Sequence, residues 1–369
     1  MAPTTAAITP TSQAHEKTLG EQYVVHKKDR AMVGHKDFSD DIPVISLAGI
    51  DEDYPGGRRE QILKKIVSAC EEWGIFQVVD HGISDELFTQ MFELSRQFFA
   101  LPDEYKLRYK MTQGKKGGFT VSSHFPDEAV ANWRELMLFM ERPIQGRDYS
   151  QWPDKPEGWR PIIDEYGVKL AEVSGKLYEL LSEGLRLERD ALTKTLGEIH
   201  GHLVVNHYPK CPQPDLAVGL KRHTDPSSMT VLLQDQVGGL QATKDDAKTW
   251  VTVRPIKNAL VVNLGEHLYY MSNGRYKRAD HRAIVNGEHN RMSIALFFHG
   301  ENEAKVYPLN VKEGETPLLE EPITYAEMRK RHNILYLDRI KIAKLAEREN
   351  WSQEELMRKL TELEQRSNA

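Results

Sequence analysis

Two histidines and one aspartate in the C-terminal half of the chain have the residue types and spacing of a metal site. His223 and Asp225 are two residues apart, and His281 follows further along the chain. Two imidazoles and one carboxylate are the ligand set of a facial triad, which holds Fe(II) and leaves coordination positions open for substrate and dioxygen. A pure thiolate site is excluded, because the 369 residues include only two cysteines. These residues predict an iron-dependent oxidation.

The choice of these three ligands depends on strand geometry and on one competing histidine. On a strand, residues i and i+2 share a face, so His223 and Asp225 would point into one cavity. A His-x-Asp pair taken alone is more often a surface pair or a packed histidine, because the chain has 14 histidines. His267 competes for the third ligand position. His281 is preferred, since residues 279–282 lead into a strand near Arg291.

Arg291 and Ser293 lie on one face of a predicted strand and suit an acidic co-substrate. A guanidinium can bind a carboxylate through two parallel hydrogen bonds, and a hydroxyl adds another. For Arg291 alone, a structural salt bridge would be the simpler role. The same face continues through Phe297 and His299. The opposite face is apolar and predicts packing against helices; it consists of Met292, Ile294, Leu296 and Phe298.

A second predicted strand carries two further polar residues. Asn206 and Tyr208 share a face and could reach the same co-substrate. His207 lies on the other face, where a packed or surface histidine is expected. His81, directly after another predicted strand, is also expected to be structural.

The elements that must position these residues form a helical part followed by a part rich in strands. Apolar residues at helical spacing predict helices at 58–73, 84–99 and 158–187. A strand is expected at 75–79, and residues 111–132 read as a long loop. Short strands with turn signals between them follow at 202–208, 229–234, 250–253, 260–264 and 293–298. This order predicts an α+β fold with a jelly-roll core and flanking helices.

We expect four regions along the chain. Residues 1–40 form a flexible N-terminal arm with one short helix, and residues 41–200 form a mainly helical region that packs on the core. Residues 201–305 form the jelly-roll core. Residues 306–369 form a C-terminal helical region, either a lid over the mouth of the site or a solvated amphipathic helix on the surface.

Composition excludes several other classes of protein. The chain has 49 basic and 55 acidic residues, a net charge of −6, so neither nucleic acid nor a membrane surface is an expected partner. No apolar stretch approaches the roughly 18 residues of a spanning helix. Cys70 and Cys211 predict no disulfide framework, and the N-terminus lacks the apolar segment of a secretory signal. We therefore expect a cytoplasmic protein.

Several longer motifs carry a resemblance to the plant 2-oxoglutarate- and Fe(II)-dependent dioxygenases, from about residue 40 to about residue 335. These motifs lie at residues 43–47, 73–82, 206–214, 223–225, 237–241 and 272–275. Within that family the chain looks most like the flavanone-oxidising branch, flavanone 3-hydroxylase and flavone synthase I. The marks of this branch lie at residues 45–50, 147–150, 152–159 and 219–225.

The resemblance implies a distorted double-stranded β-helix (jelly-roll) core and a defined set of cofactors. By this likeness Fe(II) is held by His223, Asp225 and His281. The distal carboxylate of 2-oxoglutarate is held by Arg291 and Ser293, helped by Tyr208 and Asn206. Dioxygen is the other co-substrate and ascorbate the reductant. We expect a small flavonoid as substrate, and a monomer open to loose association with other pathway enzymes.

The implied reaction is oxidation of the C ring of a flavanone such as naringenin, with release of succinate and CO2. Return of a hydroxyl to C3 gives a dihydroflavonol, loss of a second hydrogen gives a flavone, and a hydroxyl at C2 gives a 2-hydroxyflavanone. Which product forms depends on how the substrate is placed relative to the metal, and a shift of about an ångström is enough to change the outcome. Residues 136–140, 207, 266–270 and 297–300 depart from the family pattern and leave the product open.

Four residues are candidates for contact with the flavonoid. Phe297 could stack on it, and Leu136 and Leu138 could line the same pocket, although all three are equally expected as ordinary core. His299 could bind a phenol or face solvent.

Three other functions remain open. A zinc hydrolase could use the same His/Asp/His ligands, but would leave Arg291 and Ser293 unexplained. A non-catalytic jelly-roll binding protein would be expected to lack a ligand. A sister dioxygenase could act on another scaffold, as flavonol synthase, anthocyanidin synthase or a hormone oxidase does.

Overall fold

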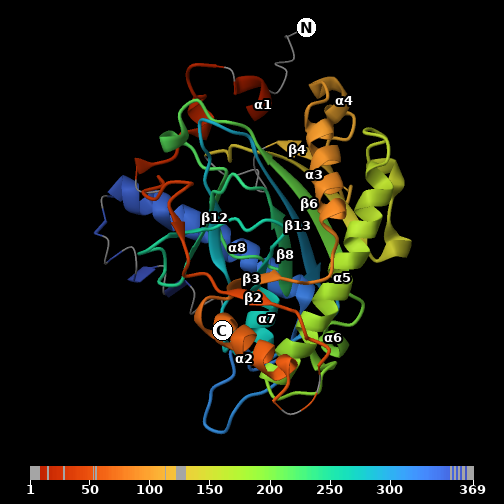
Figure 1. Cartoon of the computed structure of the whole chain (residues 1–369). Helices are drawn as coiled ribbons and strands as arrows, with labels where there is room; N and C mark the ends of the chain where they lie inside the picture. Colours follow the sequence, from red (N-terminus) through yellow and green to blue (C-terminus); the bar gives the residue numbers. More distant parts are fainter. Residues whose placement is uncertain are drawn as a thin grey trace.

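Two β-sheets face each other and helices cover the outer face of the larger one (Figure 1). The computed structural model describes residues 9–14, 16–27, 30–52, 54, 56–112, 114–121 and 130–349, together with 351, 352, 355, 358, 359, 362 and 363. The larger sheet has eight strands in the order β2 (Val44–Ser46), β3 (Ile75–Val79), β11 (Leu260–Leu264), β8 (Met229–Gln234), β13 (Arg291–His299), β6 (His200–Tyr208), β5 (Glu135–Arg142) and β4 (Gly118–Val121).

The smaller sheet carries two of the three candidate metal ligands. Its five strands are ordered β1 (Phe38–Ser39), β10 (Val251–Val253), β9 (Leu240–Thr243), β12 (Asp280–Ala283) and β7 (Leu220–His223). A separate ribbon pairs β14 (Lys305–Val306) with β15 (Ile323–Thr324). This double-sheet arrangement confirms the predicted jelly-roll core with flanking helices.

Three long helices pack side by side against the larger sheet: α2 (Arg58–Glu72), α3 (Asp85–Phe99) and α5 (Trp159–Gly184) (Figure 1). Ser84 begins α3 as its N-cap, because its hydroxyl accepts a hydrogen bond from the Leu87 amide. The shorter helices are α1 (Pro10–Gln13), α4 (Asp103–Leu107), α6 (Ala191–Leu196) and α7 (Glu266–Met271), and α8 (Tyr325–Glu349) follows the ribbon.

Strand β13 shows how alternation divides the core into two parts. Met292, Ile294, Leu296 and Phe298 lie in the large outer cluster with the helices, as predicted. On the other face, Ala295 lies in an inner cluster between the two sheets, and Phe297 packs against it. The inner face is therefore the one that can line a site.

Most of the predicted elements are confirmed, with boundary shifts of a few residues, but the loop at 111–132 is wrong in part. Residues 118–121 form β4, which pairs with β5; residues 113 and 122–129 lie outside the described part. Strand β5 itself was not predicted, because its sequence from Glu135 to Arg142 has no clean alternation of apolar and polar residues.

The described part of the segment 1–40 contacts the body at several points. The Thr11 amide donates to Glu135 Oε1, 2.9 Å away, and β1 pairs with β10. The Tyr23 ring packs edge-on against Trp133, with 4.9 Å between ring centroids. Among the described residues, no helix is both long enough and apolar enough to cross a membrane.

Candidate metal and co-substrate site

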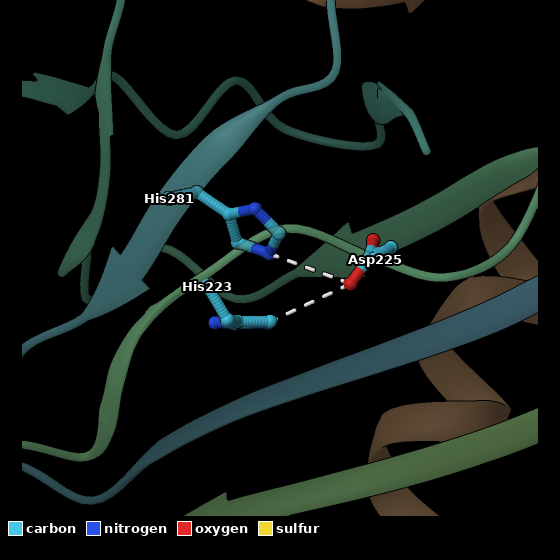
Figure 2. Close-up of side chains that lie close together, drawn as sticks. All are labelled: His223, Asp225 and His281. Atoms are coloured by element: carbon cyan, nitrogen blue, oxygen red, sulfur yellow. Dashed lines mark ion pairs between the residues drawn. The ribbon is translucent and has the colours of Figure 1, made fainter. Parts of the chain in front are cut away.

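His223, Asp225 and His281 converge between the two sheets (Figure 2). Their ligand atoms all lie within 4.8 Å of one another, and Asp225 Oδ1 is 3.6 Å from His223 Nε2 and 3.9 Å from His281 Nε2. The two histidines are direct partners in the β7–β12 pairing, with ring centroids 4.2 Å apart. This is a set of three donors that could hold one metal ion.

Backbone carbonyls fix which ring nitrogen of each histidine is free. His223 Nδ1 lies 2.8 Å from the Lys221 carbonyl oxygen, and His281 Nδ1 lies 3.1 Å from that of Ala279. A carbonyl can only accept, so each Nδ1 carries the proton and each Nε2 keeps its lone pair directed at the centre. Burial, together with the adjacent His281, lowers the pKa of His223 to about 3, so the ring is neutral and able to bind a metal.

Asp225 is placed differently from the expectation. Strand β7 ends at His223, so Asp225 follows the strand rather than sharing one of its faces. Its Oδ2 accepts a 2.7 Å hydrogen bond from Thr230 on β8, and its backbone oxygen accepts one from the Glu266 amide at the start of α7. Contacts from two other elements therefore aim Oδ1 at the histidines.

Arg291 lies nearly fully buried on the inner face of β13, with 2 % of its surface exposed. Its Nη2 donates to Gln234 Oε1 at 3.1 Å, and its guanidinium lies 5.1 Å from the centroid of the Tyr208 ring. Among the described residues, its Nε and Nη1 have no hydrogen-bond partner. Two unsatisfied donors on a buried cation fit a carboxylate ligand and disfavour the structural salt bridge considered for this residue.

The other three residues expected at the co-substrate lie around Arg291. Strand pairing sets Tyr208 opposite Arg291, and Asn206 opposite Ser293. Arg134, which sequence reasoning missed, donates from Nη1 to Asn206 Oδ1 at 3.0 Å. Because arginine is only a donor, this bond turns the amide NH2 of Asn206 away from it, where it can serve as a donor.

The four candidates for flavonoid contact all lie on the inner face of the larger sheet. Leu136 pairs with Asn206, Leu138 pairs with Val204, and Phe297 lies partly buried on β13. His299 is buried, so the solvent-facing role considered for it is wrong. Its two ring nitrogens contact the Gly300 carbonyl and His202, at 2.7 and 3.0 Å.

Three other histidines considered from the sequence lie away from the metal ligands, and His207 and His81 have the structural positions expected of them. His207 is buried and stacks on Phe99, with 4.9 Å between ring centroids. His81 Nε2 lies 2.9 Å from the Asn258 carbonyl oxygen. His267 is fully buried in α7 against Tyr325 and lies outside the group of three ligands, which supports the choice of His281.

Thr230 and His202 are the further inner-face residues that sequence reasoning missed. Alternation along β6 could have revealed His202, because it shares parity with Asn206 and Tyr208. No sequence signal marks Thr230, whose contact with Asp225 depends on how the chain turns between β7 and β8.

Two family models match the chain. The model described as the 2OG-Fe(II) oxygenase superfamily matches residues 199–300, which include all three candidate metal ligands. The model described as the N-terminal region of a non-haem dioxygenase in morphine synthesis matches residues 42–155. Together the two matches cover most of both sheets and the helices α2, α3 and α4.

Similar proteins support the same assignment over nearly the whole chain. A flavanone 3-dioxygenase from Petroselinum crispum is 56% identical over 94% of this chain and 93% of its own length. A flavone synthase from the same plant is 52% identical over 90% of this chain and 89% of its own length. The crystal structure of JOX2 in complex with 2OG, Fe and JA has a TM-score of 0.79 and 34% identity, and covers 89% of this chain and 94% of that one.

The geometry of the site and the likeness to known dioxygenases indicate the same chemistry. Neutral imidazole and carboxylate donors suit Fe(II), and the unsatisfied donors of Arg291 suit an acidic co-substrate. The chain belongs to the 2OG-Fe(II) oxygenase superfamily and is an oxidoreductase that depends on Fe(II) and 2-oxoglutarate.

Proposed function

We propose that this enzyme oxidises the C ring of a flavanone such as naringenin. Fe(II) binds His223 Nε2, His281 Nε2 and Asp225 Oδ1, and the distal carboxylate of 2-oxoglutarate binds Arg291 and Ser293. Tyr208 and Asn206 complete the co-substrate site. The observation that carries the dependence on 2-oxoglutarate is the buried Arg291 with two unsatisfied donors.

The residues of this chain bind, orient and shelter the reactants. When bound, the iron and 2-oxoglutarate supply oxidation by dioxygen, with 2-oxoglutarate converted to succinate and CO2. Ser293 and Phe297 are four residues apart on β13, about 13 Å along a strand. The co-substrate therefore binds at the Arg291 end of the inner face, and the flavanone binds at the Phe297 end, bordered by Leu136 and Leu138.

The flavanone is proposed as substrate because of the likeness to two kinds of relative. The flavanone 3-dioxygenase and flavone synthase of Petroselinum crispum are 56% and 52% identical to this chain, so both products are consistent with its sequence. A jasmonate-induced oxygenase from Arabidopsis thaliana is 34% identical. This lower identity favours the flavanone over another scaffold.

The test is anaerobic reconstitution with Fe(II), 2-oxoglutarate, ascorbate and naringenin, followed by exposure to air and mass spectrometry. We expect succinate with a flavonoid product, and a mass gain of 16 indicates hydroxylation whereas a loss of 2 indicates desaturation to a flavone. NMR of a hydroxylated product separates C3 from C2. Succinate without a modified flavanone would reject the substrate and retain the family chemistry.

Zinc distinguishes the oxygenase from a hydrolase with the same ligands. Zn²⁺ binds nitrogen and oxygen sites more tightly than Fe(II), so added zinc should displace iron and inhibit the oxygenase.

His223→Ala or Asp225→Ala should abolish turnover and weaken iron binding. Activity supported by zinc alone, without 2-oxoglutarate, would favour the hydrolase.

We also propose that the enzyme works as a cytoplasmic monomer with ascorbate as its reductant. It would be open to loose association with other enzymes of the pathway. The net charge of −6 supports the absence of a nucleic-acid partner. Size-exclusion chromatography with light scattering tests the monomer, and omission of ascorbate during repeated turnover tests the reductant.

A further inference from the structure

Four aromatic side chains form a continuous stack at the Phe297 end of the inner face. Tyr325, the first residue of α8, lies between His267 and His299, with ring centroids 5.1 and 4.8 Å away. His299 stacks in turn on His202, with centroids 5.0 Å apart and planes inclined by 15°. The stack joins α7, α8, β13 and β6, so the rings have little freedom to move.

Hydrogen bonds along the stack determine where the protons lie. The Gly300 carbonyl can only accept, so His299 Nδ1, 2.7 Å away, carries a proton. Burial, together with the neighbouring His202, lowers the pKa of His299 to about 3. The ring is therefore neutral and its Nε2 is an acceptor.

The acceptor on His299 fixes the tautomer of His202. His202 Nδ1 lies 3.0 Å from His299 Nε2, so His202 Nδ1 must donate. Burial lowers the pKa of His202 to about 4, with contributions from Arg329, His200 and Lys116, so His202 is also neutral. Its Nε2 is then an acceptor, and it has no hydrogen-bond partner in the described part of the chain.

The strand register gives the separation between His202 and Thr230, the residue that bonds the metal ligand Asp225. Thr230, which holds Asp225, pairs with Phe297, and Phe297 pairs with His202. Neighbouring strands are about 4.8 Å apart, so His202 lies about 10 Å across the sheet from Thr230. Phe297 lies between them on the same face. A flat aromatic molecule placed over Phe297, with one end at the metal, would bring its far end to His202.

We propose that His202 is a specificity-determining residue, whose Nε2 accepts a hydrogen bond from a phenolic hydroxyl at the end of the flavanone remote from the metal. This inference rests on the proposed function. His299 is a positioning residue, because it holds His202 in the accepting tautomer. A methyl ether in place of the phenol cannot donate, so the pocket selects free phenols.

The experiment compares naringenin with its 7-methyl and 4′-methyl ethers in the wild type and in His202→Phe, which retains a ring for the stack and removes the acceptor. In the wild type, kcat/KM should fall for the ether that blocks the bonded hydroxyl, and the position of that ether identifies the hydroxyl. In His202→Phe we expect kcat/KM for naringenin to fall about three- to tenfold, the effect of one hydrogen bond, mainly through KM. The KM for 2-oxoglutarate should not change.

Three further variants make the result specific. His202→Gln keeps an acceptor oxygen and should retain most of the preference. His299→Leu leaves His202 in place but frees its tautomer, and should lose part of the preference. His289→Leu replaces an exposed histidine, 61% exposed at its side chain, and should retain the wild-type preference. Flavanone affinity measured without dioxygen should follow the same order, independently of turnover.

The measured preferences separate the role of His202 from flavanone oxidation itself. If the wild type oxidises all three flavanones equally well, or if His202→Phe keeps the wild-type preference, the role of His202 is overturned while flavanone oxidation stands. An unchanged preference in His299→Leu would overturn the tautomer relay. If the wild type forms succinate but oxidises no flavanone, the proposed function itself fails.

Discussion

At the scale of single residues, the site is set up by hydrogen bonds to groups that do not touch the metal. The Lys221 and Ala279 carbonyls orient the two imidazoles, and Thr230 leaves Asp225 one free oxygen. Such contacts orient each donor atom in the metal-free protein, so that less conformational entropy is lost when the metal binds. Metal affinity should therefore depend on residues that do not themselves contact the metal.

Thr230→Val should weaken metal binding while Asp225 remains in place. The substitution is close to isosteric but removes the 2.7 Å hydrogen bond to Asp225 Oδ2, and losses of this kind cost roughly 10- to 100-fold in metal affinity. Anaerobic equilibrium titration with Fe(II) or Co(II) measures the effect. Thr252→Val is the matched control, since Thr252 is equally buried but bonds Gln241 and the Gly34 carbonyl. Equal affinity in wild type and Thr230→Val would contradict the expectation.

Arg291→Gln should raise the KM for 2-oxoglutarate far more than the KM for the flavanone. It removes the charged donors Nε and Nη1, and bonds to charged groups are worth about 1.5–3 kcal/mol, roughly a 10- to 150-fold effect. Arg291→Lys keeps the charge but not the paired donors, so its effect should be intermediate. Steady-state kinetics with each substrate varied provides the measurement, and an equal change in both KM values would reject the assignment.

At the scale of elements, the short helix α7 connects the metal site to α8. The Glu266 amide bonds the Asp225 backbone, and the Glu266 carboxylate is paired with Arg278 and lies 3.8 Å from His332 of α8. Tyr325 inserts the start of α8 between His267 and His299. These contacts hold the first turns of α8 against the core.

Glu266→Gln should lower the free energy of unfolding at neutral pH and reduce its decrease at acidic pH. Burial alone would raise the pKa of Glu266, but the charge of Arg278, aided by His332, lowers it to about 2 from its ordinary 4.5. The charged carboxylate therefore contributes stability that is fully present above about pH 4.5 and is lost as the pH falls toward 2. At pH 7 the variant leaves Arg278 without its partner, at a cost of roughly 3 kcal/mol.

Chemical denaturation of Glu266→Gln and wild type at several pH values measures this effect. The difference in free energy of unfolding between the two proteins should shrink between pH 4.5 and the lowest pH at which both remain folded. The control is Glu327→Gln on α8, because Glu327 is 42% exposed and its pair with Arg331 is worth at most about 1 kcal/mol. A difference that stays constant with pH would contradict the charge-based account.

At the scale of the whole molecule, the predicted regions share one core. Strand β5 from the 41–200 region pairs along most of its length with β6 from the 201–305 region, and the outer cluster draws on both. The arm also contacts β5, because the Thr11 amide donates to Glu135, itself paired with the buried Lys106 at 3.2 Å. These regions are therefore expected to fold together.

A fragment of residues 201–305 should not fold alone. It would lack β5, β3 and the three long helices, and would expose the apolar outer face of β13 at Ile294, Leu296 and Phe298. The full chain should unfold in one calorimetric transition, whereas two separated transitions or a fragment with dispersed NMR signals would show independent domains.

Local sequence patterns were sufficient to predict the chemistry of this protein and the order of most of its elements. Residue type and spacing indicated His223, Asp225 and His281 as metal ligands, although Asp225 lies beyond the end of β7 and not on the shared strand face that was expected. Arg291 and Ser293 could be placed on one face because strand alternation is a local rule. Helices α2, α3 and α5 were predictable from apolar periodicity for the same reason.

The contacts that surround those residues depend on the folded chain and could not be predicted from local patterns. The bond from Thr230 to Asp225, the bond from Arg134 to Asn206 and the stack of His202, His299 and Tyr325 each join segments through strand register or helix docking. No local pattern encodes such pairings. Strand β5 was missed for the same reason, since its place between β4 and β6, and not its own sequence, makes it a strand.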